Sequence, residues 1–248
     1  MYPGKYAEQN PDRSAFVMAA TGERVSYQEF EARSNRVAHY LADKGLGFQD
    51  HYSIFMENNN RYLESCAAGE RSGLYFTCIN SFLTSDELAY IINNSESKIL
   101  ITSISKLEAA QEALAQCVAI KEVLVVGAGD ADLPQGMSDF ESALSKYPET
   151  PLEKELLGAA MLYSSGTTGR PKGIVRPLPE QSPDEPLPVI GFLSGLWRYR
   201  EDMIYLSPAP LYHSAPQAAV GLTLRMGGTV VIMERFDPAD YLRFVEEY

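Results

Sequence analysis

The sequence is poor in cysteine, histidine and tryptophan: its 248 residues include three Cys, three His and one Trp. The cysteines, Cys66, Cys78 and Cys117, contain no CxxC pair and have no group of histidines near them. Neither a disulfide framework nor a zinc site is therefore predicted. We interpret the three side chains as reduced thiols.

Long apolar runs are also missing, and no stretch approaches the length that crosses a membrane. The N-terminal segment carries Lys5, Glu8, Asp12 and Arg13 where a secretory leader would have an apolar region. We therefore expect a cytoplasmic protein without a transmembrane segment.

Positive charge is in deficit, because 21 Lys and Arg stand against 33 Asp and Glu, for a net charge of -12. Binding of a nucleic-acid backbone requires a surplus of Lys and Arg on at least one face. We therefore expect no nucleic-acid partner. The apolar content of 45% is ordinary for a globular core, and a chain of this length needs no disulfide or metal to stabilise it.

Apolar runs without polar alternation occur between helical patterns along the whole chain. Six of them are typical of strands covered on both faces: residues 51–56, 99–102, 123–126, 159–164, 203–207 and 229–233. Strands that alternate with helices predict an α/β fold, with a mainly parallel sheet flanked by helices on both faces. Ligands are expected near the carboxyl ends of such strands.

Local signals mark where several elements begin. Residues 14–27 predict a short hairpin that leads into a helix. Three capping boxes predict helix starts, at Ser26 with Glu29, Thr84 with Glu87, and Ser105 with Glu108. Residues 177–188 contain five prolines, which favours a loop or flap, or a linker between domains.

A last helix is predicted after Asp237 and Pro238, an N-cap followed by a first-turn proline. Its apolar face continues to Tyr248 without a Gly, an Asn or a basic last turn to close it. We therefore expect a truncated chain.

The most specific segment is YSSGTTGRPKG, residues 163–173, which follows an apolar run directly. Glycines let backbone N–H groups converge on an anion, and the Ser and Thr hydroxyls are further donors. Arg170 and Lys172 add positive charge in an acidic protein. The segment therefore predicts a polyphosphate-binding loop, although a Gly/Ser/Thr-rich surface turn without a ligand is the simpler alternative.

The two common nucleotide-binding motifs do not match this segment. A Walker loop needs Gly-Lys followed by Ser or Thr, whereas Arg170 and Pro171 separate Gly169 from Lys172. A Rossmann fingerprint fails because no helical pattern starts at the glycines.

YSSGTTGRPKG resembles the phosphate-binding loop of the adenylate-forming superfamily, which includes acyl-CoA synthetases, aryl-CoA ligases, luciferases and peptide-synthetase adenylation domains. Three further blocks are similar to that family in the same order. They are NPDRSAF with RVSYQEFEARSNRVAHYLADKGLG, then ERSGLYFTCINSFLTSDELAYIINNSESKILI around Arg71, Ser72 and Gly73, and LSPAPLYHSA at 206–215. The middle block and IVRPLP most resemble bacterial fatty acyl-CoA synthetases.

The resemblance implies a two-step ligase that uses ATP, Mg²⁺ and coenzyme A as well as a small-molecule carboxylate. The carboxylate attacks the α-phosphate of ATP and releases pyrophosphate, and the thiol then displaces AMP from the acyl-adenylate. The leading expectation is a fatty acyl-CoA synthetase. The alternatives are an aryl or other carboxylate-CoA ligase, or a non-catalytic nucleotide-binding short form.

The resemblance also implies the site residues. The phosphates of ATP would be bound by Ser164, Ser165, Gly166, Thr167, Thr168, Gly169, Arg170 and Lys172, with Thr167 or Thr168 near Mg²⁺. His213 would be the catalytic residue and, with Tyr212, would border the substrate carboxylate. From its residue type alone, His213 could equally be a partly buried loop histidine with a satisfied hydrogen bond.

Several later blocks of the family are missing from residues 1–248, among them the acidic Tyr-Gly-x-Thr-Glu block, the ribose-binding Asp motif, the hinge and the C-terminal lysine segment. The chain is therefore expected to be the first half of the family's large N-terminal domain, without its C-terminal half and without the C-terminal domain. We predict that it cannot complete adenylation alone. Carboxylate-dependent exchange of labelled pyrophosphate into ATP by these 248 residues would contradict this prediction.

Overall fold

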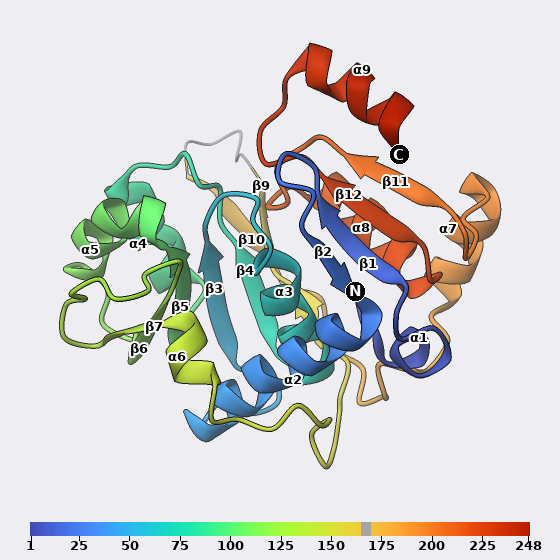
Figure 1. The fold of residues 1–248 in the computed structure, drawn as a ribbon. Helices are drawn as coiled ribbons and strands as arrows, with labels where there is room; N and C mark the ends of the chain where they lie inside the picture. The colour runs from blue at the N-terminus through green and yellow to red at the C-terminus, as the bar shows by residue number, and fades with distance from the viewer. Residues whose placement is uncertain (165–169) are drawn as a thin grey trace.

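The computed structural model describes residues 1–164 and 170–248 and confirms the predicted α/β fold (Figure 1). Its larger sheet has six strands in the order β7-β6-β5-β3-β4-β8, and every neighbouring pair is parallel. The strands are β3 (His51–Phe55), β4 (Tyr75–Cys78), β5 (Ile99–Ser103), β6 (Glu122–Val126), β7 (Met137–Asp139) and β8 (Ala159–Ala160).

A second sheet joins the two ends of the chain in the order β11-β12-β1-β2. Its strands are β1 (Ser14–Met18), β2 (Arg24–Ser26), β11 (Ile204–Ser207) and β12 (Thr229–Ile232). β1 and β2 form the predicted antiparallel hairpin, and β12 pairs with β1 in parallel, with Phe16 opposite Val230.

The run predicted as one strand at 159–164 is divided between two sheets. Ala159 and Ala160 form β8 beside β4, whereas β9 (Leu162–Ser164) pairs with β10 (Lys172–Ile174) in a separate antiparallel hairpin. The chain therefore leaves the large sheet just before the predicted phosphate loop.

Helices cover both faces of the six-stranded sheet, with α2, α3 and α6 on one side and α4 and α5 on the other (Figure 1). The helices are α1 (Gly4–Gln9), α2 (Tyr27–Asp43), α3 (Tyr62–Arg71), α4 (Ser85–Asn94), α5 (Leu107–Leu114), α6 (Phe140–Leu144), α7 (Pro188–Trp197), α8 (Ser214–Arg225) and α9 (Pro238–Glu247). Ile54 of β3 packs in the core with Phe30 of α2, and the next residue, Phe55, packs in the opposite core with Ile92 of α4. This double coverage explains why the strand runs lack polar alternation.

Two of the three predicted capping boxes are present, at Ser26 and at Thr84. The third, at Ser105, is wrong. The Ser105 hydroxyl donates to a carboxylate oxygen of Glu57 over 2.7 Å, and Lys106 is the residue before α5. The Glu57 carboxylate, from the segment after β3, bonds to the hydroxyl that would have formed the local cap. Asp237 accepts hydrogen bonds as the N-cap of α9, as predicted.

The proline-rich segment packs against the domain as a loop. Leu178 is buried with Tyr75 and Met161, and the backbone oxygen of Gln181 accepts a hydrogen bond from the Leu157 N–H over 2.8 Å. These contacts favour the loop interpretation over a linker.

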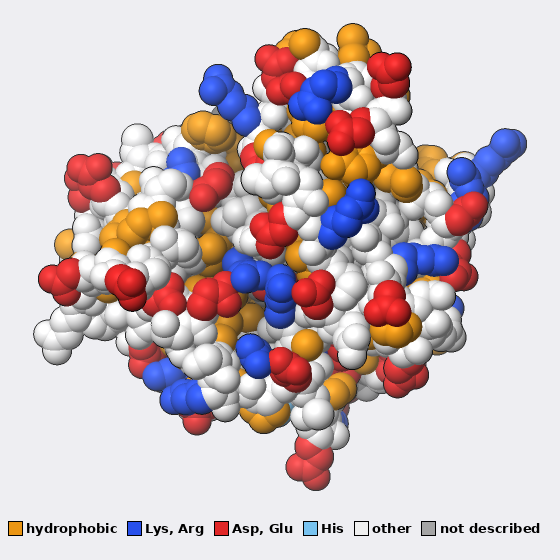
Figure 2. Space-filling view, in the orientation of Figure 1, with side chains coloured by type: hydrophobic (Ala, Val, Ile, Leu, Met, Phe, Trp, Pro, Cys, Tyr) orange, Lys and Arg blue, Asp and Glu red, His pale blue; other side chains and the backbone are white. Residues whose placement is uncertain are grey.

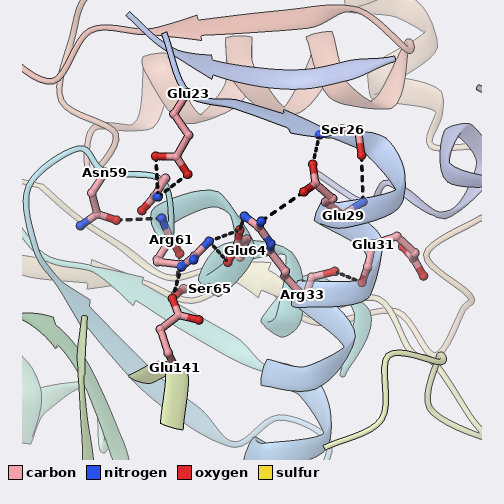
Figure 3. Close-up of polar contacts among 12 residues, drawn as sticks. Glu23, Ser26, Glu29, Glu31, Arg33, Asn59, Arg61, Glu64, Ser65 and Glu141 are labelled. Carbon is pink, nitrogen blue, oxygen red and sulfur yellow. Dashed lines mark hydrogen bonds and ion pairs between the residues drawn. The ribbon is translucent and has the colours of Figure 1, made fainter. Parts of the chain in front are cut away.

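A buried charge network links α2, α3 and α6 (Figure 3). Glu64 of α3 is 1% exposed and accepts hydrogen bonds from Arg33 over 3.2 Å and from Arg61 over 3.0 Å. Arg61 also contacts Glu141 at the start of α6. Around this network, acidic and basic side chains are interspersed across the middle of this face of the molecule (Figure 2).

Burial raises the pKa of Glu64 to about 7, from 4.5, although Arg61 and Arg33 oppose the shift. A carboxyl with a raised folded-state pKa binds its proton more tightly in the folded state. Its contribution to stability is therefore present at low pH and is lost as the pH rises from 4.5 to about 7.

We predict that Glu64→Gln removes this pH dependence. The free energy of unfolding of the wild type, measured by urea denaturation, should fall across that pH window by roughly 3 kcal/mol more than that of the variant. Glu112→Gln, at an exposed position of α5, should keep the wild-type slope. Parallel profiles for wild type and Glu64→Gln would contradict the prediction.

Candidate functional site

A cavity of about 260 Å³ lies where the carboxyl ends of β3 and β4 meet those of β11 and β12. Glu57 and Asn58 follow β3 and Ser81 follows β4, while Tyr212 and residues 233–236 come from the second sheet. The cavity thus occupies the edge at which parallel strands are expected to bind ligands.

Asn58 holds the two sheets together at this edge. Its side-chain amide donates to the backbone oxygens of Met233 over 2.9 Å and Ala209 over 3.2 Å. Its oxygen accepts from the Leu211 N–H over 2.9 Å. Asn58 is 8% exposed. Its side chain therefore fixes both the loop after β11 and the end of β12 from a buried position.

The two residues expected to border the carboxylate lie side by side after Leu211. Tyr212 lines the cavity, and its ring centroid is 4.5 Å from that of His213. Burial raises the pKa of Tyr212. His213 is exposed at the start of α8, outside the cavity lining, and its ring forms no hydrogen bond in the described part of the chain. A buried histidine with a satisfied hydrogen bond is therefore not what the structure contains.

The predicted phosphate loop lies within the β9–β10 hairpin. Ser164 and Lys172 are cross-strand partners there. The remaining expected ligands in the loop, and with them the expected Mg²⁺ residues, lie outside the described residues: Ser165, Gly166, Thr167, Thr168 and Gly169.

The loop end of this hairpin contacts α4. The guanidinium of Arg170 lies 5.2 Å from the ring centroid of Tyr90, and the Tyr90 hydroxyl donates to the Pro171 backbone oxygen over 3.1 Å. Lys172 is exposed and forms no ion pair within residues 1–164 and 170–248. Arg170 thus packs on α4, and none of Ser164, Arg170 and Lys172 lines the cavity beside Tyr212.

The hairpin has the chemistry that an anionic ligand needs. The Ser164 hydroxyl and the Lys172 ammonium, which forms no ion pair with a described residue, are donors on opposite strands, and such donors suit the oxygens of a polyphosphate. Across the described ranges, no group of three or more His, Cys, Asp or Glu side chains is placed to bind a metal ion. Within the same ranges, no helix has the length and apolar character needed to span a membrane.

Sequence reasoning missed Glu57, Asn58 and Ser81. A signal existed for the first two, because they are polar residues directly after a predicted strand. Ser81 had no such signal, since β4 was not among the six predicted runs.

Comparisons with known proteins agree with this fold. The model of the family described as "AMP-binding enzyme" matches residues 5–248. The 4-coumarate-CoA ligase 1 of Petroselinum crispum is 28% identical over 242 residues, covering 96% of this chain and 43% of the relative. A ligase of Mycolicibacterium smegmatis, named for medium/long-chain fatty acids and 3-oxocholest-4-en-26-oate, is 27% identical, covering 96% and 45%.

Among solved structures, ATP-bound MatB from Rhodopseudomonas palustris superposes with a TM-score of 0.76 at 28% identity, over 99% of this chain and 48% of MatB. A putative long-chain-fatty-acid CoA ligase from the same species reaches a TM-score of 0.84 at 24% identity, which supports the fold alone. The chain spans less than half the length of the two curated relatives named above.

We predict that Asn58→Asp destabilises the protein, because a carboxylate oxygen would replace the amide donor that faces two carbonyl oxygens. The expected loss in the free energy of unfolding is roughly 2–4 kcal/mol. Asn94→Asp is the matched control, since Asn94 uses its oxygen to accept from the Tyr163 hydroxyl and an Asp retains that acceptor. Its expected change is within about 0.5 kcal/mol. Equal losses in urea denaturation would show that Asn58 does not fasten the sheets.

Proposed function

The chain belongs to the AMP-binding enzyme family, and on that basis we propose that it is the nucleotide- and acid-binding part of a carboxylate-CoA ligase. In the proposed reaction, an oxygen of the carboxylate attacks the α-phosphate of ATP, and pyrophosphate leaves. The sulfur of coenzyme A then attacks the acyl carbon, and AMP leaves with the electrons of the broken acyl–oxygen bond.

Residues 163–173 are proposed to bind the phosphates of ATP. Ser164 and Lys172 would contact them from opposite strands of the hairpin, and Arg170 would add positive charge beside Tyr90. The segment Ser165–Gly169 would contribute backbone N–H groups and hydroxyls. Such a loop would act by positioning the reacting groups and stabilising charge.

Magnesium would neutralise phosphate charge when it binds together with ATP. We propose the hydroxyl of Thr167 or Thr168 as the protein group near it. The chemistry of the segment supports this assignment, since hydroxyl oxygens are hard ligands of the kind that Mg²⁺ accepts.

The acid is proposed to lie in the cavity, with its carboxylate near Tyr212 and His213. The observation that carries this proposal is the position of Tyr212, which lines a cavity between the strand ends of both sheets. Phe82, Met233 and Phe236 give that cavity apolar walls suited to a hydrocarbon chain.

A fatty acid is our leading substrate class, in line with the fatty-acid ligase of M. smegmatis among the relatives. An aryl acid is the second candidate, because the P. crispum relative is named as a 4-coumarate-CoA ligase. A binding series of aliphatic and aromatic acids of similar size would separate the two classes.

We predict that Lys172→Ala weakens the binding of ATP and of pyrophosphate by about tenfold, because one charge-assisted contact to the phosphates is lost. Isothermal titration calorimetry with each ligand measures the effect. Lys154→Ala, at another exposed lysine, should leave both affinities unchanged. If Lys172→Ala binds ATP and pyrophosphate with wild-type affinity, the proposal that the hairpin binds phosphate is wrong.

A further inference from the structure

Glu57 presents a carboxylate of fixed orientation at the cavity. Its Oε2 accepts hydrogen bonds from the hydroxyls of Ser103 over 2.6 Å and Ser105 over 2.7 Å. Ser103 is the last residue of β5, the strand beside β3, and Ser105 lies in the turn that follows it, so the carboxylate is held from one side. Its other oxygen, Oε1, accepts no hydrogen bond from the described residues.

A second polar group of the cavity lacks a partner. Ser81 is only 5% exposed and lines the same cavity, and its hydroxyl forms no hydrogen bond within the described ranges. Because this hydroxyl lies at the cavity and has no partner among the described residues, it is available to a ligand that enters the cavity. Glu57 and Ser81 together offer acceptors to such a ligand.

No cation among the described residues pairs with the Glu57 carboxylate at the cavity. Glu234 accepts from the Ala20 N–H, and the exposed Arg235 forms no ion pair with Glu57 or any other described residue. The remaining surroundings include the apolar and aromatic residues Phe82 and Phe236. The result is a cavity with apolar walls and a few polar groups, the usual composition of a site that orients a small organic ligand.

We propose that this cavity binds the far end of an aliphatic carboxylic acid that carries a hydrogen-bond donor, a hydroxyl or an ammonium group. Glu57 is the specificity-determining residue, and Oε1 accepts the hydrogen bond of that donor, with Ser81 as a second partner. This inference rests on the proposed function and specifies its substrate class. A site built to bond a polar group rejects an analogue that lacks the group far more strongly than an apolar pocket can.

The test uses three acids of the same length whose far ends differ: heptanoate, 6-hydroxyhexanoate and 6-aminohexanoate. Their dissociation constants for the 248-residue chain are measured by isothermal titration calorimetry in the presence of ATP. We expect the hydroxy acid and the amino acid to bind at least about tenfold more tightly than heptanoate. Whichever of these two acids binds more tightly shows whether the site prefers a neutral hydroxyl or a charged ammonium group.

Variants then assign the preference to Glu57. Glu57→Leu should abolish the advantage of both polar acids while leaving heptanoate binding unchanged or stronger. Glu57→Gln keeps an acceptor oxygen but not the charge, so it should lose the preference for the ammonium and retain part of the preference for the hydroxyl. Ser81→Ala should reduce both preferences. Glu153→Gln, at an exposed position, is the control that should match the wild type.

The outcomes separate this inference from the proposed function. Equal binding of the three acids by the wild type, or a full preference in Glu57→Leu with an unchanged melting temperature, would overturn the donor site while acid binding stands. Failure of folded wild-type protein to bind any of the three acids would overturn both proposals.

Discussion

The site depends on the amide of Asn58, because that group bonds to two segments of the second sheet from the end of a strand of the first. Without it, nothing equivalent among the described hydrogen bonds would tie the end of β3 to the loop that carries Tyr212. The cavity wall is formed on one side by Glu57, its neighbour in sequence, and on the other by residues that Asn58 holds. One buried side chain therefore connects the two walls of the cavity.

The arginines inside the domain contact carboxylates, whereas the lysine of the β9–β10 hairpin does not contact one among the described residues. Arg71 is fully buried and contacts both carboxylate oxygens of Glu31 at 2.6 and 2.7 Å, and Arg61 and Arg33 surround the buried Glu64. Arg71 is neutralised by Glu31 inside the domain, where an unpaired charge would be costly. Lys172 has no such partner among the described residues, so its charge stays available to an anion.

The sequence predicted those parts of the fold whose cause is local. Apolar runs identified β3, β5, β6, β11 and β12, and the capping boxes at Ser26 and Thr84 identified two helix starts. The capping box at Ser105 failed because Glu57, distant in the sequence but adjacent in the sheet, offers the hydroxyl a carboxylate. β4 was missed because YFTC is a short run that contains a polar Thr77, which the structure nonetheless buries.

What the sequence determined by itself is therefore the class of fold, the starts of two helices at Ser26 and Thr84, and the composition of the segment proposed to bind phosphate, all of which depend on residues close along the chain. The tertiary structure alone decided where the cavity lies and which polar groups face it. The three bonds of Asn58 join residues 151, 153 and 175 positions apart, and Glu57 meets Ser103 and Ser105 across 46 and 48 positions. No local pattern in the sequence predicts these contacts, because they form only when parallel strands bring their carboxyl ends to the same edge of a sheet.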